Sequence, residues 1–134
     1  MSATDSFFDT NTLLYLISSE TRKAARSEEL LGQGGTISAQ VLNEFAAVAR
    51  RKHKMDWPAV RDLLGKFRAA FKVVSITEAS QLKAMDLAER HQFSVYDANI
   101  VAAAQLAGCT TLFSEDMQNG MVLDGLTIKN PYLT

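Results

Sequence analysis

Four acidic residues stand at positions that a fold of alternating strands and helices would bring to one edge. Asp9 directly follows a short aromatic run, and Asp116 lies two residues after the apolar run that ends at Ser114. Glu44 lies one or two turns into a helical pattern, on or beside its apolar face, and Asp97 opens a helix that is apolar nearly all round. Clustered carboxylates repel one another unless they are protonated or bridged by a cation, and such oxygen ligands suit Mg²⁺ or Mn²⁺. An acidic cleft with such an ion hydrolyses phosphodiester bonds, because the metal activates water and neutralises charge on the leaving oxygen.

Each of these acids also has an ordinary structural role when it is considered alone. Asp97 fits the N-cap of its helix, where a carboxylate accepts a hydrogen bond from a free backbone N–H group. Asp9 fits a turn, Asp116 a solvated loop and Glu44 the solvent-facing side of its helix. The metal site is therefore a hypothesis about the four acids together, and it requires a fold that places them side by side.

The elements that must position the acids are short strands alternating with helices. Apolar runs predict strands over 6–8, 36–38, 73–76, 110–114 and 126–128. The spacing of apolar residues and the capping signals predict helices over 13–17, 19–31, 39–52, 57–71, 77–91 and 95–107. This alternation indicates parallel βαβ units and an α/β fold with helices on both faces of the sheet. In such a fold the ligand site lies beyond the carboxyl ends of the strands, where the four acids are expected.

Length and composition indicate a single folded domain, expected to span residues 1–134. Hydrophobic residues make up 47% of the chain and charged residues 22%, which argues against a wholly disordered protein. The one Cys cannot form a disulfide framework, and the longest purely apolar run, Ile100 to Ala104, is far shorter than the roughly 20 residues of a membrane span. The first residues show no signal-peptide pattern. We therefore expect a soluble, cytoplasmic protein that does not contact a membrane.

The distribution of charge favours a polyanionic substrate, although the formal net charge of −1 does not. Without the four acids, the 15 acidic residues fall to 11, against 14 Lys and Arg residues. Groups of such cations bind phosphate backbones in a salt-dependent way. They also occur as solvated helix faces and ends, since a cation near a helix C-terminus is favourable. The candidates for contact with a nucleic acid are Arg22, Arg26, Arg50, Arg51 and Lys52.

The acids lie in short motifs whose order and spacing resemble the PIN-domain nucleases, and within them the VapC-type toxins of VapBC toxin–antitoxin pairs. Each motif alone is weak, but the ordered set runs from Ser6 to about Ile128. The motifs are Phe8-Asp9-Thr10-Asn11, Ser38 followed by Glu44-Phe45, Tyr96-Asp97-Ala98 and Leu112-Phe113-Ser114-Glu115-Asp116-Met117. The resemblance implies a compact three-layer α/β/α sandwich around a short parallel sheet.

The resemblance also implies a site and an activity. The four acids match the acidic quartet of the family, with Asp9 and Asp97 as the expected core metal ligands. Ser114 is expected to orient ligands through hydrogen bonds, and Asn11 to orient Asp9. The implied activity is endoribonuclease cleavage that depends on Mg²⁺ or Mn²⁺ and leaves 5′-phosphate and 3′-hydroxyl ends, with transfer RNA as the favoured substrate. Implied partners are a second copy of the chain and a VapB-type antitoxin that docks near the cleft.

Three further residues carry weaker expectations. Glu115 adds a fifth acid, which is expected to face solvent rather than to bind a metal-bound water. Tyr96 is expected to pack in the core rather than to offer a surface for stacking bases. Trp57 is expected to serve packing or a dimer contact rather than nucleic-acid stacking.

Two other functions are compatible with parts of the sequence. Residues 7–12 come close to the Asp-x-Asp-x-Thr motif of haloacid-dehalogenase-type phosphatases. Asn11 stands where that motif has its second acid, however, and the chain is short for that fold. The other alternative is a PIN-like scaffold that binds RNA or assembles with partners without catalysis. Loss of an acid would favour the scaffold, and no acid of the quartet is lost.

Overall fold

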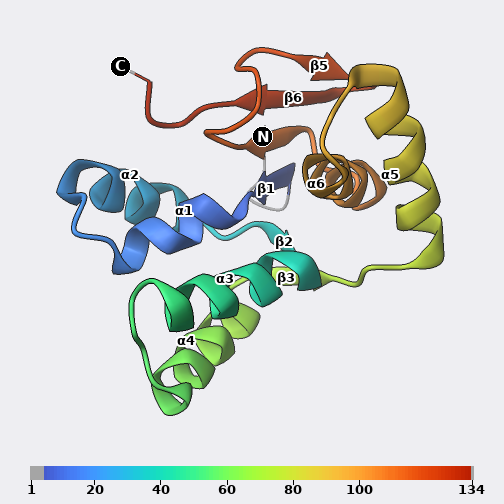
Figure 1. The fold of residues 1–134 in the computed structure, drawn as a ribbon. Coiled ribbons are helices and arrows are strands. Elements are labelled where there is room, and N and C mark those ends of the chain that lie inside the picture. Colours follow the sequence, from blue (N-terminus) through green and yellow to red (C-terminus); the bar gives the residue numbers. More distant parts are fainter. Residues whose placement is uncertain (1–4, 134) are drawn as a thin grey trace.

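The strands predicted from the sequence all form, and they belong to one sheet (Figure 1). A computed structural model describes residues 5–133, so the ends of the domain expected over 1–134 lie outside the described residues. The sheet has the strand order β3-β2-β1-β4-β6-β5. Its strands are β1 (Ser6–Phe8), β2 (Thr36–Ser38), β3 (Lys72–Val74), β4 (Thr111–Phe113), β5 (Val122–Leu123) and β6 (Leu126–Lys129).

The short strand β5 is the element that the sequence analysis missed. It pairs antiparallel with β6, whereas the other neighbouring strands are parallel. Asp124 and Gly125 join the two strands and both have positive φ, which is the geometry of a tight hairpin turn. A strand of two residues is too short to show an alternating pattern, so the Asp-Gly pair was its only local signal.

Helices cover both faces of this sheet and begin and end within a few residues of the predicted positions. α5 and α6 pack together on one face, and α1 to α4 lie on the other (Figure 1). No helix within residues 5–133 has the length and apolar content needed to cross a membrane. The helices are α1 (Thr10–Leu14), the 3₁₀ segment η2 (Tyr15–Ile17), α2 (Thr21–Leu31), α3 (Ala39–Arg51), α4 (Trp57–Ala70), α5 (Glu78–His91) and α6 (Val95–Leu106).

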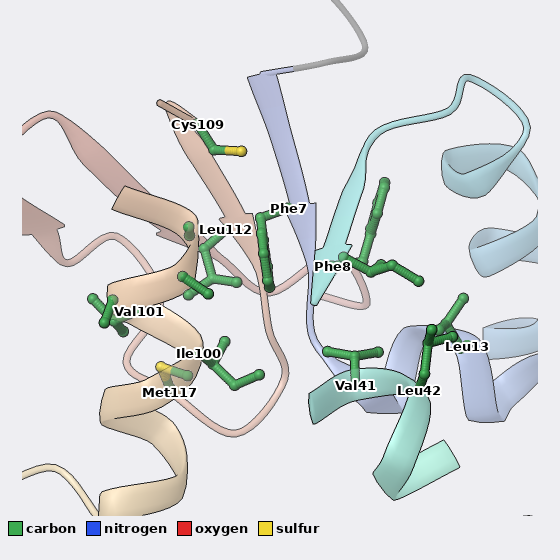
Figure 2. Close-up of a cluster of buried hydrophobic side chains, with 14 of the residues drawn as sticks. Phe7, Phe8, Leu13, Val41, Leu42, Ile100, Val101, Cys109, Leu112 and Met117 are labelled. Carbon is green, nitrogen blue, oxygen red and sulfur yellow. The ribbon is translucent and has the colours of Figure 1, made fainter. Parts of the chain in front are cut away.

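The hydrophobic core lies on both sides of the central strand β1. Successive side chains of a strand point to opposite faces. Phe7 therefore lies toward α6, whereas Phe8 lies on the side of α1 and α3 (Figure 2). Phe8 stacks on Phe113 with ring centroids 5.6 Å apart and meets Phe71 edge-on at 6.0 Å. Packing on both faces of β1 thus fixes the end of the strand that carries Asp9.

The parallel strands bring the predicted acids to one edge of the sheet. Asp9 follows β1 and Asp116 follows β4, the neighbour of β1, while Glu44 lies on α3 directly after β2. The chain passes from β1 to β2 on one side, and β4 lies on the other. Open α/β sheets bind ligands at such a change of direction, beyond the carboxyl ends of the strands.

Candidate active site

Asp9 ends β1 and caps α1, and both of its carboxylate oxygens are anchored. Oδ1 accepts the backbone N–H of Thr10 at 2.7 Å, and Oδ2 accepts the hydroxyl of Ser114 at 2.9 Å. The residue is only 3% exposed. Burial raises the pKa of Asp9 to about 6; the two hydrogen bonds oppose this shift, and the charges of Asp116 and Asp97 add to it. The fold therefore fixes the orientation of the Asp9 carboxylate but does not fully stabilise its ionised form.

Asp116 lies in the loop after β4 and belongs to the same hydrogen-bond network. Its backbone N–H donates to Ser114 Oγ at 3.3 Å, so one hydroxyl contacts both Asp9 and Asp116. The amide of Asn11 donates to Asp116 Oδ2 at 2.9 Å. Asn11 was expected to orient Asp9, but its side chain bonds Asp116 instead. Side chains two residues apart at the start of a helix, such as those of Asp9 and Asn11, do not face each other.

Asp97 lies in the first turn of α6 but does not cap that helix. The N-cap is Ser94, whose hydroxyl oxygen accepts the backbone N–H of Asp97 at 3.0 Å. Burial raises the pKa of Asp97, the charge of Asp116 adds to this effect, and the hydrogen bonding with Ser94 opposes it. Since Ser94 satisfies the helix end, the capping role considered for Asp97 is filled by another residue.

Glu44 lies on α3, and its carboxylate is only partly satisfied by hydrogen bonds. Its Oε2 is buried and has no hydrogen-bond partner within the described part of the chain. Burial raises the pKa of Glu44, and the charge of Asp9 adds to the shift, while a hydrogen bond with the Thr10 side chain opposes it. The Thr10 hydroxyl also lies 2.9 Å from the hydroxyl of Tyr96. A buried carboxylate oxygen without a partner is costly, and a bound cation would satisfy it.

Together the four carboxylates form a negative cluster. None of them forms an ion pair within residues 5–133. Over the same range, no three His, Cys, Asp or Glu side chains are close enough to enclose a metal ion. Mg²⁺ does not require such an enclosure, because it keeps several waters and needs only one or two carboxylates. The all-oxygen donor set, the mutual repulsion of the acids and the unpartnered Glu44 oxygen therefore fit a hard divalent cation.

Replacing Ser114 with Ala is expected to weaken Mn²⁺ binding by about 10- to 100-fold, the usual cost of removing an outer hydrogen bond to a metal ligand. Because the Ser114 hydroxyl lowers the pKa of Asp9, its loss should also move Mn²⁺ binding to higher pH. Calorimetric titration with Mn²⁺ at pH 6 and pH 8 measures both effects. The matched control is Ser27→Ala, since Ser27 is also buried and bonds the Tyr132 hydroxyl at 2.7 Å instead of an acid. Equal Mn²⁺ affinities in the two variants would contradict the positioning role of Ser114.

Glu115 does not face solvent as expected. It forms an ion pair with Lys23 and accepts a hydrogen bond from the hydroxyl of Tyr15. Burial alone would raise the pKa of Glu115, but the bonds from Lys23 and Tyr15 outweigh it and lower the pKa below its ordinary value. The expectation failed because Lys23 and Tyr15 approach from α2 and η2, far away in the sequence. Glu115 thereby ties the loop that carries Asp116 to the neighbouring helices.

The five basic residues that were predicted to contact a nucleic acid lie in different environments. On α2, Arg22 donates to the carbonyl of Tyr132 at 3.2 Å and Arg26 to that of Pro131 at 3.0 Å, so both hold the C-terminal segment. Arg50 donates to the carbonyl of Met55 at 3.0 Å and stacks on Trp57, its guanidinium carbon 4.6 Å from the ring centroid. Trp57 is 56% exposed, so much of its ring remains accessible beside this contact.

Arg51 and Lys52 are exposed, and they differ from these arginines because neither side chain has a hydrogen-bond, ion-pair or stacking partner within the described residues. Arg51 lines a cavity of about 510 Å³ beside Glu44, together with Gln40, Asn43 and Tyr96. Tyr96 is half-buried; it packs against the hydrophobic core, as expected, and it also lines this cavity. The sequence analysis did not single out Gln40 and Asn43 as neighbours of the acids. Their position within four residues of Glu44 on the same helix was the available signal.

Comparisons with known proteins identify the family and the fold. The profile of the PIN-domain family matches residues 6–118. No curated protein sequence matches the chain at a significant level.

Three solved structures are similar to this one. A toxin–antitoxin complex from Klebsiella pneumoniae has a TM-score of 0.73 and 22% identity, over 95% of this chain and 98% of that one. VapC20 of Mycobacterium tuberculosis, a toxin that cleaves the sarcin-ricin loop, has a TM-score of 0.68 and 19% identity, over 83% and 91%. VapBC2 of Rickettsia felis, bound to a DNA fragment from its promoter, has a TM-score of 0.65 and 18% identity, over 92% and 96%. At these identities the likeness shows the fold.

Proposed function

Because the chain belongs to the PIN-domain family, we propose that it is a divalent-metal-dependent endoribonuclease and the toxin of a VapBC-type toxin–antitoxin pair. The observation that carries the proposal is the meeting of four carboxylates from separate elements at one sheet edge, where no cation of residues 5–133 pairs with them. Such a cluster suits a divalent ion and a phosphodiester substrate. The family match also favours a nuclease over the phosphatase that residues 7–12 suggested.

In this proposal each residue of the site has a distinct task. Asp9 and Asp97 would hold the metal directly, whereas Glu44 and Asp116 would bind the waters that the ion keeps. The bound ion would supply an activated water and neutralise charge on the leaving oxygen. Ser114 holds the carboxylate of Asp9 and the backbone of Asp116 in fixed positions, so that neither needs to reorient during the reaction. Asn11 orients Asp116.

The proposed substrate and partners follow from the family and from the similar structures. Transfer RNA remains the proposed substrate; cleavage of the sarcin-ricin loop by the Mycobacterium tuberculosis neighbour supports an RNA target that includes an exposed loop. The Klebsiella pneumoniae neighbour is a toxin–antitoxin complex, which supports a VapB-type antitoxin as partner of this chain. A homodimer is proposed on the family resemblance.

The test of the proposed function is cleavage of total cellular RNA by the purified protein, freed of any co-purifying antitoxin. Mg²⁺ or Mn²⁺ is added in one arm and a chelator in the other, and sequencing of new 5′-phosphate ends maps the cut sites. Discrete cuts that need the metal are expected, and their positions identify the target. Folded protein that cuts no RNA with either metal would contradict the nuclease and leave a non-catalytic PIN-like scaffold.

A further inference from the structure

We propose that a groove along α3, beside the acidic cluster, is a subsite for one unstacked nucleotide of single-stranded RNA. The proposal rests on the proposed nuclease function, because it places this nucleotide next to the phosphate that is cleaved. We call it the α3 groove, and it is lined by Gln40, Asn43, Ala47, Val48, Arg51 and Tyr96.

The position of the α3 groove connects it directly to the acids. Its lining residues on α3 recur at intervals of three and four, so they share one face of the helix with Glu44, which also lines the cavity. A second hollow of about 130 Å³ adjoins it at Val48 and is lined by Asn11 and Lys52, among others. The first hollow is lined by Glu44, and the second by Asn11, which is bonded to Asp116, so both border the acidic cluster. A chain lying along this face of α3 would therefore pass the acids.

The lining of the α3 groove suits a nucleobase. Ala47 and Val48 offer an apolar floor for the face of a base, and amide groups such as those of Gln40 and Asn43 recognise its polar edge. The Tyr96 ring is held in place, because its hydroxyl lies 2.9 Å from that of Thr10 and its carbonyl accepts the Gln40 amide at 3.4 Å. A volume of about 510 Å³ falls in the range of sites for small organic ligands, roughly 300–1,000 Å³.

The charge at the α3 groove suits the phosphate of that nucleotide. Arg51 lies at the groove, is exposed and has no ion pair within residues 5–133, whereas its neighbour Arg50 packs on Trp57. A guanidinium binds phosphate oxygens through paired hydrogen bonds. The groove thus combines an apolar floor, amide groups and one cation next to a cluster of metal-binding acids, which is the chemistry of a nucleotide.

An unstacked nucleotide in the α3 groove implies single-stranded RNA rather than a duplex. A base can enter a groove of this kind only after it has left its stack and its pairing partner. In a loop or a single strand that separation costs little, whereas in a duplex each inserted base must be unpaired first. RNA loops and unpaired segments are therefore the substrate class that the groove accepts.

The test measures RNA binding with full-length protein carrying Asp9→Asn, so that the RNA stays intact. The probe is a fluorescein-labelled pool of random eight-nucleotide RNA, compared with a labelled duplex of the same length, and binding is followed by anisotropy at several salt concentrations. Ala47→Phe fills the groove without changing charge, and Ala69→Phe on α4, also at an exposed alanine, is its control. Arg51→Gln removes the groove cation, and Arg68→Gln, in the last turn of α4 before the start of β3, is its control.

We expect Ala47→Phe and Arg51→Gln each to weaken single-strand binding by about tenfold, the effect of losing one charged hydrogen bond or one stacked base. Arg51→Gln should also reduce the slope of log affinity against log salt by about 0.7, the value for one phosphate contact on a single strand. Neither control should change the affinity, and the parent should prefer the single strand to the duplex.

Single-strand binding that survives both Ala47→Phe and Arg51→Gln would overturn the proposal and leave the groove to a protein partner. Equal affinity for duplex and single strand would overturn it as well. The nuclease function is tested separately, by metal-dependent cleavage with Asp9 intact. Cleavage without groove-dependent binding would refute only the subsite, and groove-dependent binding without cleavage would refute only the nuclease.

Discussion

Replacing Asp9 with Asn is expected to lower RNA cleavage by more than about 100-fold and, at the same time, to stabilise the metal-free protein at neutral pH. The first effect follows from the loss of a proposed metal ligand. Mutation of a residue that only hydrogen-bonds to a metal ligand already lowers metal affinity or activity by about 10- to 100-fold. The amide keeps the shape of the carboxylate and, like aspartate, is a good N-cap, so α1 should still form.

The second effect follows from the raised pKa of Asp9. The pKa is about 6 in the folded protein and 3.8 in an exposed Asp, so between these pH values the folded state binds a proton that the unfolded state lacks. The free energy of unfolding therefore falls as pH rises from about 4 to about 6, and the loss is complete at pH 7. It amounts to at most about 3 kcal/mol. Asn removes this loss, although weaker hydrogen bonds to Ser114 and Thr10 subtract from the gain.

Urea unfolding at pH 5 and pH 7 in the presence of chelator measures the second effect. The matched control is Asp56→Asn, because Asp56 is also an N-cap, accepting the backbone N–H of Ala59 at 2.9 Å, but is exposed and belongs to no acidic cluster. Asp56→Asn should cut RNA normally and gain no stability at pH 7. Cleavage by Asp9→Asn at the parental rate would refute the metal site. A lower stability of Asp9→Asn than of the parent at pH 7 would refute the conclusion that the ionised Asp9 destabilises the metal-free protein.

Adding Mg²⁺ or Mn²⁺ is expected to raise the thermal midpoint of unfolding, because the ion relieves the repulsion among four uncompensated carboxylates. At 100 times its Kd, a ligand of the folded state stabilises by about 2.7 kcal/mol. For a domain of this size that corresponds to roughly 10 °C. KCl at equal ionic strength separates general screening of charge from specific binding, since screening requires no divalent ion.

The thermal shift caused by the divalent ion should depend on pH in a defined direction. Below pH 6 Asp9 is largely protonated in the metal-free protein, so the ion must displace a proton and its affinity falls by about tenfold for each further pH unit. The shift should therefore be large at pH 7.5 and small at pH 5, and Asp9→Asn should reduce it at both values. An equal shift at both pH values, or the same shift with KCl, would contradict metal binding at this carboxylate.

The sequence by itself determined the strands, the helices and the acids that the fold gathers. Apolar runs, capping residues and helical spacing are local signals, and they predicted every strand except β5 and every helix to within a few residues. Because the strands are short, apolar and separated by helices, parallel pairing was the expected arrangement, with the residues that follow the strands meeting at one edge. The order of the elements along the chain was therefore enough to place Asp9 and Asp116 at the same edge, whereas the pairing of β1 with β4, which makes them neighbours, is seen only in the structure.

Only the tertiary structure decided what each polar side chain near the acids contacts. Arg50 and Arg51 are adjacent and chemically identical, yet one packs on Trp57 and the other lines the α3 groove. Asn11 bonds Asp116, which is 105 residues away, and Glu115 bonds Lys23 across 92 residues. Side-chain partners of this kind depend on the direction in which each helix leaves the sheet, and periodicity along the chain carries no information about that direction. The grooves beside the acids have the same origin, because they form between elements and belong to no single segment.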